Sequence, residues 1–169
     1  MVTSHTDAFV ESARRVDAVV TPTTVDEFAG TLEDVVTEPA VGTPLPFEGV
    51  TYDGTAVDGA PTGAALAEAA TGVTAAAAAI ADYGSVVLQE TGAGEELLGL
   101  YPDRHVVVVA ASDVVPDMPA AFEALDGQFD AGRRDAILAT GPSATADMGA
   151  VVKGVHGPRE VQILLLEDR

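Results

Sequence analysis

The chain has 169 residues, and 27 acidic residues against 8 basic ones give it a formal net charge of −19. Because binding of a polyanion needs clustered cations and the sequence has no basic stripe, nucleic acid is excluded as a partner. The absence of cysteine likewise excludes disulfides and an iron–sulfur cluster held by cysteines of this chain.

The acidic residues are spread along the chain, and Lys153 is its only lysine. This pattern favours an evenly acidic, hydrated surface suited to very high salt, as in a halophilic archaeon. The alternative is a negative face for a basic partner. Neither a signal peptide nor an apolar run of membrane-spanning length is visible. We therefore expect a cytoplasmic protein with a single domain over residues 1–169.

In the first third of the chain, helical periodicity predicts a helix over Thr6–Val16, followed by a short strand over Asp17–Val20. A capping-box pattern at Thr24–Glu27 introduces a second helix that extends to Val35. Pro39–Pro61 is rich in proline, glycine and aspartate, which indicates irregular structure or an edge strand.

Two further helices are predicted over Ala64–Ala70 and Thr74–Ala81. A longer helix is predicted over Asp117–Phe129, and its predicted inner face carries Phe122, Leu125 and Phe129. The strongest predicted strands are four continuous apolar runs: Ser85–Leu88, His105–Ala110, Ala136–Ala139 and Val161–Leu166. Such runs are typical of strands covered on both faces. The sequence therefore predicts an α/β fold with a mainly parallel sheet flanked by helices.

In an open α/β sheet, ligands bind where strands end and loops begin. The loop Gln89–Gly94 follows a predicted strand and offers backbone amides, but it lacks the third glycine of a dinucleotide motif. It also leads into Glu95 and Glu96, which would repel a phosphate. A plain turn is the favoured interpretation of this loop.

A second loop, Thr140–Gly149, follows the predicted strand that ends at Ala139. It contains two hydroxyls and a carboxylate close together, on Ser143, Thr145 and Asp147, after a flexible Gly141. An ordinary helix cap built from these residue types is the alternative to a binding loop.

A third cluster places Lys153, Gly154, His156 and Arg159 within seven residues. These cations either form structural ion pairs, for example with Asp147, or bind an anion such as carboxylate or phosphate. His156 has the chemistry of a general acid or base near neutral pH.

The catalytic candidates are therefore His156, Ser143 and Asp147, and whether any of them acts in catalysis stays open. The candidate ligand-binding residues are Gly141, Ser143, Thr145, Lys153, Gly154, His156 and Arg159. We expect the two segments that carry them to fold back on each other around a shared, mildly cationic hollow. No set of metal ligands is apparent, and His5 and His105 are interpreted as incidental.

Two of these segments resemble a known family. GPSATADM at 141–148 and GVHGPREVQILLL at 154–166 are similar to the C-terminal signature of LUD-domain proteins, the LutC/YkgG-like lactate utilisation group. Softer similarity extends upstream to residue 72, and the first third of the chain matches only in its general helical character.

The resemblance implies a fold like that of the NagB/RpiA/CoA-transferase superfamily and a role beside iron–sulfur proteins in oxidising L-lactate to pyruvate. A chain without cysteine fits a non-redox subunit or accessory factor whose partners are the iron–sulfur subunits, and which binds no cofactor of its own. A homo-oligomer is left open. One alternative is a stand-alone enzyme that binds a small anionic metabolite, such as a sugar phosphate or acyl-CoA. Another is a purely structural module.

The chain departs from the family pattern at several positions. Ala144 stands where the family usually has arginine, Gly149 replaces an acidic residue, and Asp82-Tyr83 replaces the Glu-Thr of an AETGT stretch. These changes put in doubt any ligand that the missing groups would hold.

Overall fold

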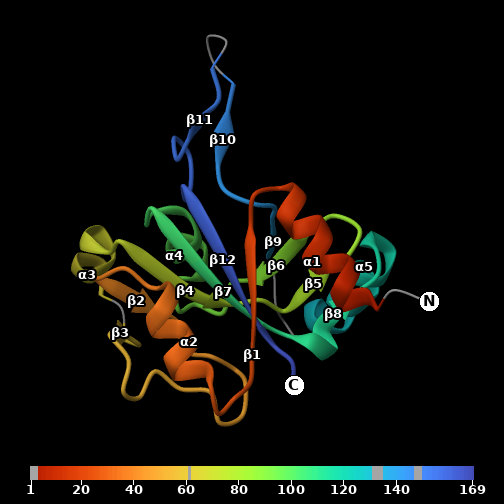
Figure 1. Cartoon of the computed structure of the whole chain (residues 1–169), viewed down its shortest axis with the longest axis horizontal. Coiled ribbons are helices and arrows are strands. Elements are labelled where there is room, and N and C mark those ends of the chain that lie inside the picture. The colour runs from red at the N-terminus through yellow and green to blue at the C-terminus, as the bar shows by residue number, and fades with distance from the viewer. Residues whose placement is uncertain (1–3, 61, 131–134, 147–149) are drawn as a thin grey trace.

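The centre of the molecule is a six-stranded sheet in which every neighbouring pair of strands is parallel. The computed structural model describes residues 4–60, 62–130, 135–146 and 150–169. In spatial order the strands are β1 (Val19–Thr23), β12 (Glu160–Leu166), β7 (Arg104–Ala110), β4 (Thr71–Ala75), β2 (Ala40–Gly42) and β3 (Val57–Asp58). This arrangement confirms the predicted α/β fold with a mainly parallel sheet (Figure 1).

A second, four-stranded sheet packs against one face of the first. Its order is β8 (Val114–Val115), β5 (Ala78–Ile80), β6 (Ser85–Gln89) and β9 (Ala136–Ala139). The β5–β6 and β6–β9 pairs are antiparallel, and only β5–β8 is parallel. Two of the four predicted apolar strands, β6 and β9, therefore lie in this smaller sheet and not in the parallel one.

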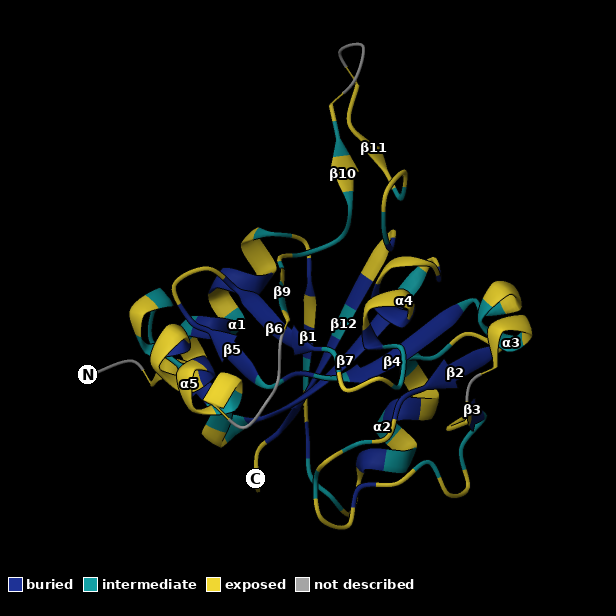
Figure 2. Cartoon of the chain, turned by 180° about the vertical axis from the view of Figure 1, so that it is seen from behind, coloured by how far each residue is buried: buried dark blue, intermediate teal, exposed yellow. Residues whose placement is uncertain are grey.

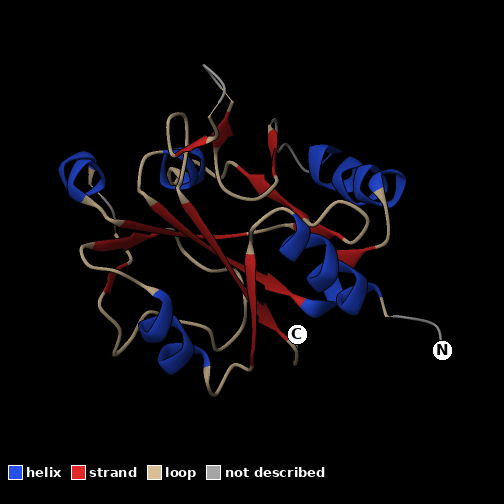
Figure 3. Cartoon of the chain, turned by 45° about the horizontal axis from the view of Figure 1, so that its top comes forward, coloured by secondary structure: helices blue, strands red, loops and turns tan. Residues whose placement is uncertain are grey.

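Helices pack around both sheets, as Figure 3 shows. They are α1 (His5–Arg15), α2 (Phe28–Val35), α3 (Gly63–Glu68), α4 (Glu95–Leu100) and α5 (Met118–Asp130). A short 3-10 turn, η1 (Ala111–Asp113), follows β7. Within the described residues, no helix has the length and apolarity that crossing a membrane requires.

The parallel sheet is buried on both faces because successive side chains of a strand point in opposite directions. On β7, Val106 and Val108 pack in the core beneath α2, whereas Val107 and Val109 pack with α1 and the second sheet. All four valines are fully buried. This two-sided burial is the physical reason for the continuous apolar runs in the sequence (Figure 2).

The prediction of a helix over Thr74–Ala81 is wrong. These residues form the end of β4 and all of β5, on either side of a two-residue link. The alanine-rich composition has a high helix propensity, but pairing with β7 and with β6 fixes an extended backbone here. Small side chains suit this region because Ala76 and Ala79 lie in the core between the two sheets.

The predicted helix over Asp117–Phe129 is present as α5, but its predicted inner face is right at Leu125 and wrong at the two phenylalanines. Phe122 is 59% exposed and Phe129 is 41% exposed, whereas Ala121 and Leu125 are buried against the second sheet. The small side chain of Ala121 allows the helix to pack closely on the sheet, and the two aromatic residues lie on the outer side.

Candidate functional site

The two C-terminal segments singled out in the sequence do come together. They form a hairpin in which β10 (Ala144–Thr145) pairs antiparallel with β11 (Val152–Lys153). At its base, the Ser143 amide donates to the Pro158 carbonyl at 2.8 Å, and the Gly154 amide donates to the Ser143 carbonyl at 3.0 Å. The expectation that these segments fold back on each other is thus confirmed, while the shared cationic hollow between them stays a prediction.

The cations of this hairpin are already paired with aspartates of the body. Lys153 Nζ lies 2.9 Å from Asp17 Oδ2, and Arg159 Nε lies 3.3 Å from Asp103 Oδ1. All four side chains are largely exposed, so each ion pair contributes little to stability. The structural interpretation of the two cations therefore has direct support, although their predicted partner was Asp147, which lies outside the described residues.

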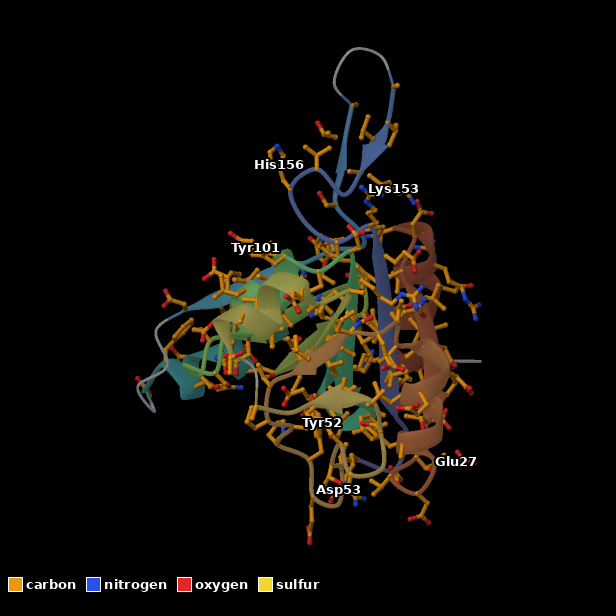
Figure 4. The ribbon with its side chains drawn as sticks, turned by 90° about the vertical axis from the view of Figure 1, so that its left-hand side faces the viewer. Glu27, Tyr52, Asp53, Tyr101, Lys153 and His156 are labelled. Carbon is orange, nitrogen blue, oxygen red and sulfur yellow. The ribbon has the colours of Figure 1, made fainter. Side chains whose placement is uncertain are left out.

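The other predicted site residues lie on the same projecting hairpin. His156 is exposed, and Figure 4 shows its side chain pointing away from the body. Its backbone amide is 3.4 Å from Ser143 Oγ, which is the contact that links these two candidates. Thr145 is half-buried on β10. A catalytic role for His156 or Ser143 remains a prediction.

The two glycines proposed as ligand-binding residues have packing roles. A Cβ at Gly141 would overlap the carbonyl oxygen of Val16, and a Cβ at Gly154 would overlap the side chain of Arg159. Both have positive φ, +61° and +76°, a conformation that strongly favours glycine. Glycine is therefore required here by local geometry, with or without a ligand.

The hairpin lies at the amino edge of the parallel sheet. It leads directly into the first residue of β12, and its partner Asp103 immediately precedes β7. The loop before β10 follows β9, which belongs to the antiparallel sheet. The rule that ligands gather at the carboxyl ends of parallel strands therefore does not apply to the hairpin.

A pocket of about 390 Å³ lies at the opposite, carboxyl edge of the parallel sheet. Thr43 and Phe47 line it just after β2, Ala75–Ala77 line it at the end of β4, and Asp113 lines it just after β7. This is where an open α/β sheet places its ligands. The volume also falls in the range of small-molecule sites, roughly 300–1,000 Å³.

Thr43 is held rigidly at this pocket by its backbone. Its amide donates to the Val73 carbonyl at 3.0 Å, and its carbonyl accepts a 2.7 Å hydrogen bond from the Tyr52 hydroxyl. Burial raises the pKa of Tyr52, so the phenol stays protonated and can donate. The Tyr52 ring packs so tightly on Gly42 and Gly59 that a Cβ at either would overlap it.

The loop after β6 supplies the polar wall. Gln89, Thr91 and Glu95 all line the pocket, and Gln89 and Glu95 are buried. The Glu95 carboxylate accepts hydrogen bonds from the backbone amide and the hydroxyl of Thr91. From the sequence, the incomplete glycine pattern of this loop favours a plain turn over a nucleotide-binding loop.

The amides of the same loop are not available to a phosphate. The Glu90 carboxylate accepts hydrogen bonds from the amides of Gly92, Gly94 and Glu96 at 2.9, 3.3 and 3.1 Å. Burial tends to raise the pKa of Glu90, but these hydrogen bonds and one with the Glu95 side chain outweigh that effect and lower it. The chain thus places its own anion where a nucleotide-binding loop would hold phosphate.

The electrostatic character of the pocket is acidic. Of the described residues that line it, Glu95 and Asp113 are the charged ones, and none is lysine, arginine or histidine. Partial burial raises the pKa of the Asp113 carboxyl. A pocket with this lining disfavours an unpartnered anion.

Two buried polar atoms at the pocket lack a partner. Among the described residues, Thr43 Oγ1 and Gln89 Nε2 have no hydrogen-bond partner, although Thr43 is 0% and Gln89 is 6% exposed. Such groups are rare in folded proteins because each costs free energy. The sequence does not reveal this site because it predicts no strand at β2 and a helix over the end of β4, which hides the adjacent strand ends.

His105, interpreted from the sequence as incidental, is fully buried beneath α4. Its Nε2 lies 2.8 Å from Thr74 Oγ1, and Gly99 of α4 packs on its ring. Burial lowers the pKa of His105 to about 4, so the imidazole is neutral near pH 7. This histidine therefore has a structural role, because it joins β4 and β7 to the helix above them.

Comparison with known proteins places the chain in a family. Residues 9–166 match the LUD domain family. Over 96 residues the chain is 35% identical to Lactate utilization protein C of Deinococcus radiodurans, which covers 56% of this chain and 45% of that protein. It is 31% identical over 105 residues to the uncharacterized protein YkgG of Escherichia coli, covering 60% and 46%. The matched region is thus less than half the length of these curated relatives.

A solved structure shares the fold. The crystal structure of a DUF162 family protein from Deinococcus radiodurans superposes with a TM-score of 0.72 at 24% identity, covering 98% of this chain and 99% of that one. At this identity the likeness concerns the fold alone. Because the family match extends over most of the sequence, the chain belongs to the LUD domain family.

Proposed function

We propose that this chain is a cytoplasmic, non-redox subunit or accessory factor of an iron–sulfur-dependent system that oxidises L-lactate to pyruvate. The observation that carries the proposal is its relationship to several proteins named Lactate utilization protein C, among them those of Deinococcus radiodurans and Bacillus velezensis. Since the sequence contains no cysteine, electrons would pass through partner subunits that hold the clusters.

The projecting hairpin supports a role in an assembly. Val151, Val152 and Val155 are 71%, 45% and 48% exposed on it, and exposed apolar side chains that gather in one place mark interaction sites. A two-stranded hairpin is also only marginally stable in water by itself. Contact with a partner subunit would cover these valines and stabilise the hairpin.

Affinity purification of the tagged chain from its native cells, followed by iron analysis and mass spectrometry, tests this proposal. We expect iron–sulfur proteins to co-purify with the wild-type chain. A variant with Val152→Asp and Val155→Asp should lose them. The matched control is Phe122→Glu, which changes an apolar side chain on α5 that is at least as exposed and should retain them.

A growth experiment provides the second readout. Deletion of the gene should impair growth on L-lactate but not on pyruvate, and the wild-type copy should restore it. Capture of no iron–sulfur protein, together with normal growth of the deletion strain on L-lactate, would contradict the proposal.

A further inference from the structure

We infer that the pocket at the carboxyl edge of the parallel sheet binds a small organic cation, a protonated amine that also carries a neutral oxygen acceptor. This site goes beyond the proposed lactate role and does not depend on it. The inference rests on the charge of the pocket lining, on its two unpartnered polar atoms, and on its size and apolar wall.

The charge of the lining selects for a cation. Glu95 is only 4% exposed, yet within the described part of the chain neither Glu95 nor Asp113 forms a salt bridge. A carboxylate withdrawn from water needs a compensating charge or several hydrogen bonds. Glu95 has two hydrogen bonds from Thr91, and its side chain also contacts the Glu90 carboxyl, a second acid and not a cation. A bound ammonium would supply the missing positive charge to both acids.

The unpartnered atoms select for an oxygen acceptor on the same ligand. The amide nitrogen of Gln89 can only donate a hydrogen bond, and the hydroxyl of Thr43 can donate one as well. Neither atom has a partner among the described residues, and both residues line the pocket. A hydroxyl or carbonyl oxygen of the ligand would satisfy both without adding a negative charge beside the two carboxylates.

The backbones that carry both donors are fixed in place before any ligand arrives. The backbone of Thr43 is held by hydrogen bonds on both sides, to Val73 and from Tyr52. Gln89 lies in β6, where it pairs with Ala136 of β9. Ordering these groups therefore costs little on binding, as expected for a preorganised site.

The remaining wall is apolar. Pro44, Pro46 and Phe47 line the pocket after β2, and Ala75–Ala77 line it between β4 and β5. With a volume of about 390 Å³, the pocket accommodates a ligand with a short carbon chain or ring between its amine and its oxygen. The phenyl ring of Phe47 provides a further favourable surface for an ammonium group.

A matched series of four-carbon probes tests the inference: 4-amino-1-butanol, 1,4-butanediol and 4-hydroxybutyrate. The three share a chain and a hydroxyl but differ in charge at the other end. Ligand-observed NMR titration of the full chain gives their relative affinities. We expect 4-amino-1-butanol to bind about tenfold more tightly than the diol, and 4-hydroxybutyrate to show no saturable binding.

Three variants locate the binding. Asp113→Asn removes one lining charge, while Thr43→Val and Gln89→Met remove the two donors with little change in shape. Each should weaken binding of 4-amino-1-butanol by about fivefold or more. Because an acidic protein attracts any cation, the matched control is Asp103→Asn, which removes the same charge at the amino edge and should leave binding unchanged.

The results that would support this site differ from those that would overturn it. Selective binding of the amine that is lost in the pocket variants and kept in Asp103→Asn supports the site. Equal binding of the amine and the diol, equal weakening by Asp103→Asn and Asp113→Asn, or no saturable binding of the amine would each overturn it.

Discussion

The two edges of the parallel sheet differ in what their polar side chains do. At the amino edge, Lys153 and Arg159 are each paired with an aspartate of the body. At the carboxyl edge, the buried Thr43 and Gln89 have polar atoms without a partner among the described residues. The ion pairs explain why the exposed cations are present without any ligand. A buried polar atom without a partner has no such explanation within the protein, and a ligand would supply one. Rarity of a residue type in the sequence is thus a weaker indicator of function than an unsatisfied atom in the structure.

Glycine substitutions should destabilise the body of the protein and the hairpin to different degrees. A Cβ at Gly72 would overlap the backbone carbonyl of Leu98 in α4, the helix that begins at Glu95. Because backbone cannot move aside cheaply, Gly72→Ala should lower the free energy of unfolding by about 3–4 kcal/mol.

The matched change on the hairpin is Gly154→Ala, whose Cβ would meet the flexible side chain of Arg159. The positive φ of Gly154 should cost about 1–2 kcal/mol, and the arginine can swing away. Urea denaturation of both variants measures the difference. Equal destabilisation would mean that α4 is not held tightly over the sheet.

Acid should destabilise the protein through His105. Its pKa in the folded state is about 4, below that of an unfolded chain, about 6.5. The unfolded state therefore binds the proton first as the pH falls. The contribution of the neutral imidazole is complete above pH about 6.5 and is lost toward pH about 4, a change of up to about 3 kcal/mol.

His105→Gln keeps a hydrogen-bonding side chain next to Thr74 but cannot titrate. The difference in stability between wild type and variant should shrink as the pH is lowered from 7 to 4. Urea titrations at several pH values measure this difference, and a constant difference would show that His105 does not titrate with a lowered pKa.

Removal of the unpartnered hydroxyl at the pocket should stabilise the ligand-free protein. Thr43→Val replaces a buried, unpaired hydroxyl with a methyl group of the same shape, so stability should rise by about 1 kcal/mol. On the hairpin, Ser143 Oγ accepts a 3.4 Å hydrogen bond from the His156 amide, and Ser143→Ala should lower stability by about 0.5 kcal/mol. Opposite signs in thermal or urea denaturation are the expected result. Destabilisation by Thr43→Val would indicate that its hydroxyl is already satisfied.

The smallest effect is expected from the ion pair at the hairpin base. A double-mutant cycle with Lys153→Met and Asp17→Asn should give a coupling free energy below about 0.5 kcal/mol, because both side chains are exposed. High salt should reduce it further. A coupling well above 1 kcal/mol that persists in high salt would show that this pair anchors the hairpin.

The sequence predicts the buried strands well and the polar edge of the sheet poorly. The apolar runs of β6, β7 and β12 give strands in the structure because burial on both faces requires continuous hydrophobicity. The run of β9 also forms a strand, but it lies at the edge of the second sheet with Leu138 42% exposed. The sequence does not show which of these strands belong to which sheet, because this depends on pairing between distant segments. The alanines of β4 and β5 carry no strand preference, so only tertiary pairing makes them extended.

The candidate sites also differ in whether their residues are near or distant in the sequence. Local contacts such as that of Ser143 with His156 could be anticipated because the hairpin is formed by neighbouring segments. The pocket draws Thr43, Gln89 and Asp113 from three segments far apart in the sequence. No spacing in the sequence links them, and only the strand order of the sheets brings them together.

The most direct test of the account is to map where a small amine binds. Backbone amide chemical shifts of the full chain, recorded during titration with 4-amino-1-butanol, report each contact separately. The account predicts saturable shifts at Thr43, Gln89 and Asp113, with none at residues 152–158 of the hairpin. Shifts confined to the hairpin, or weak shifts spread evenly over the acidic surface, would contradict it.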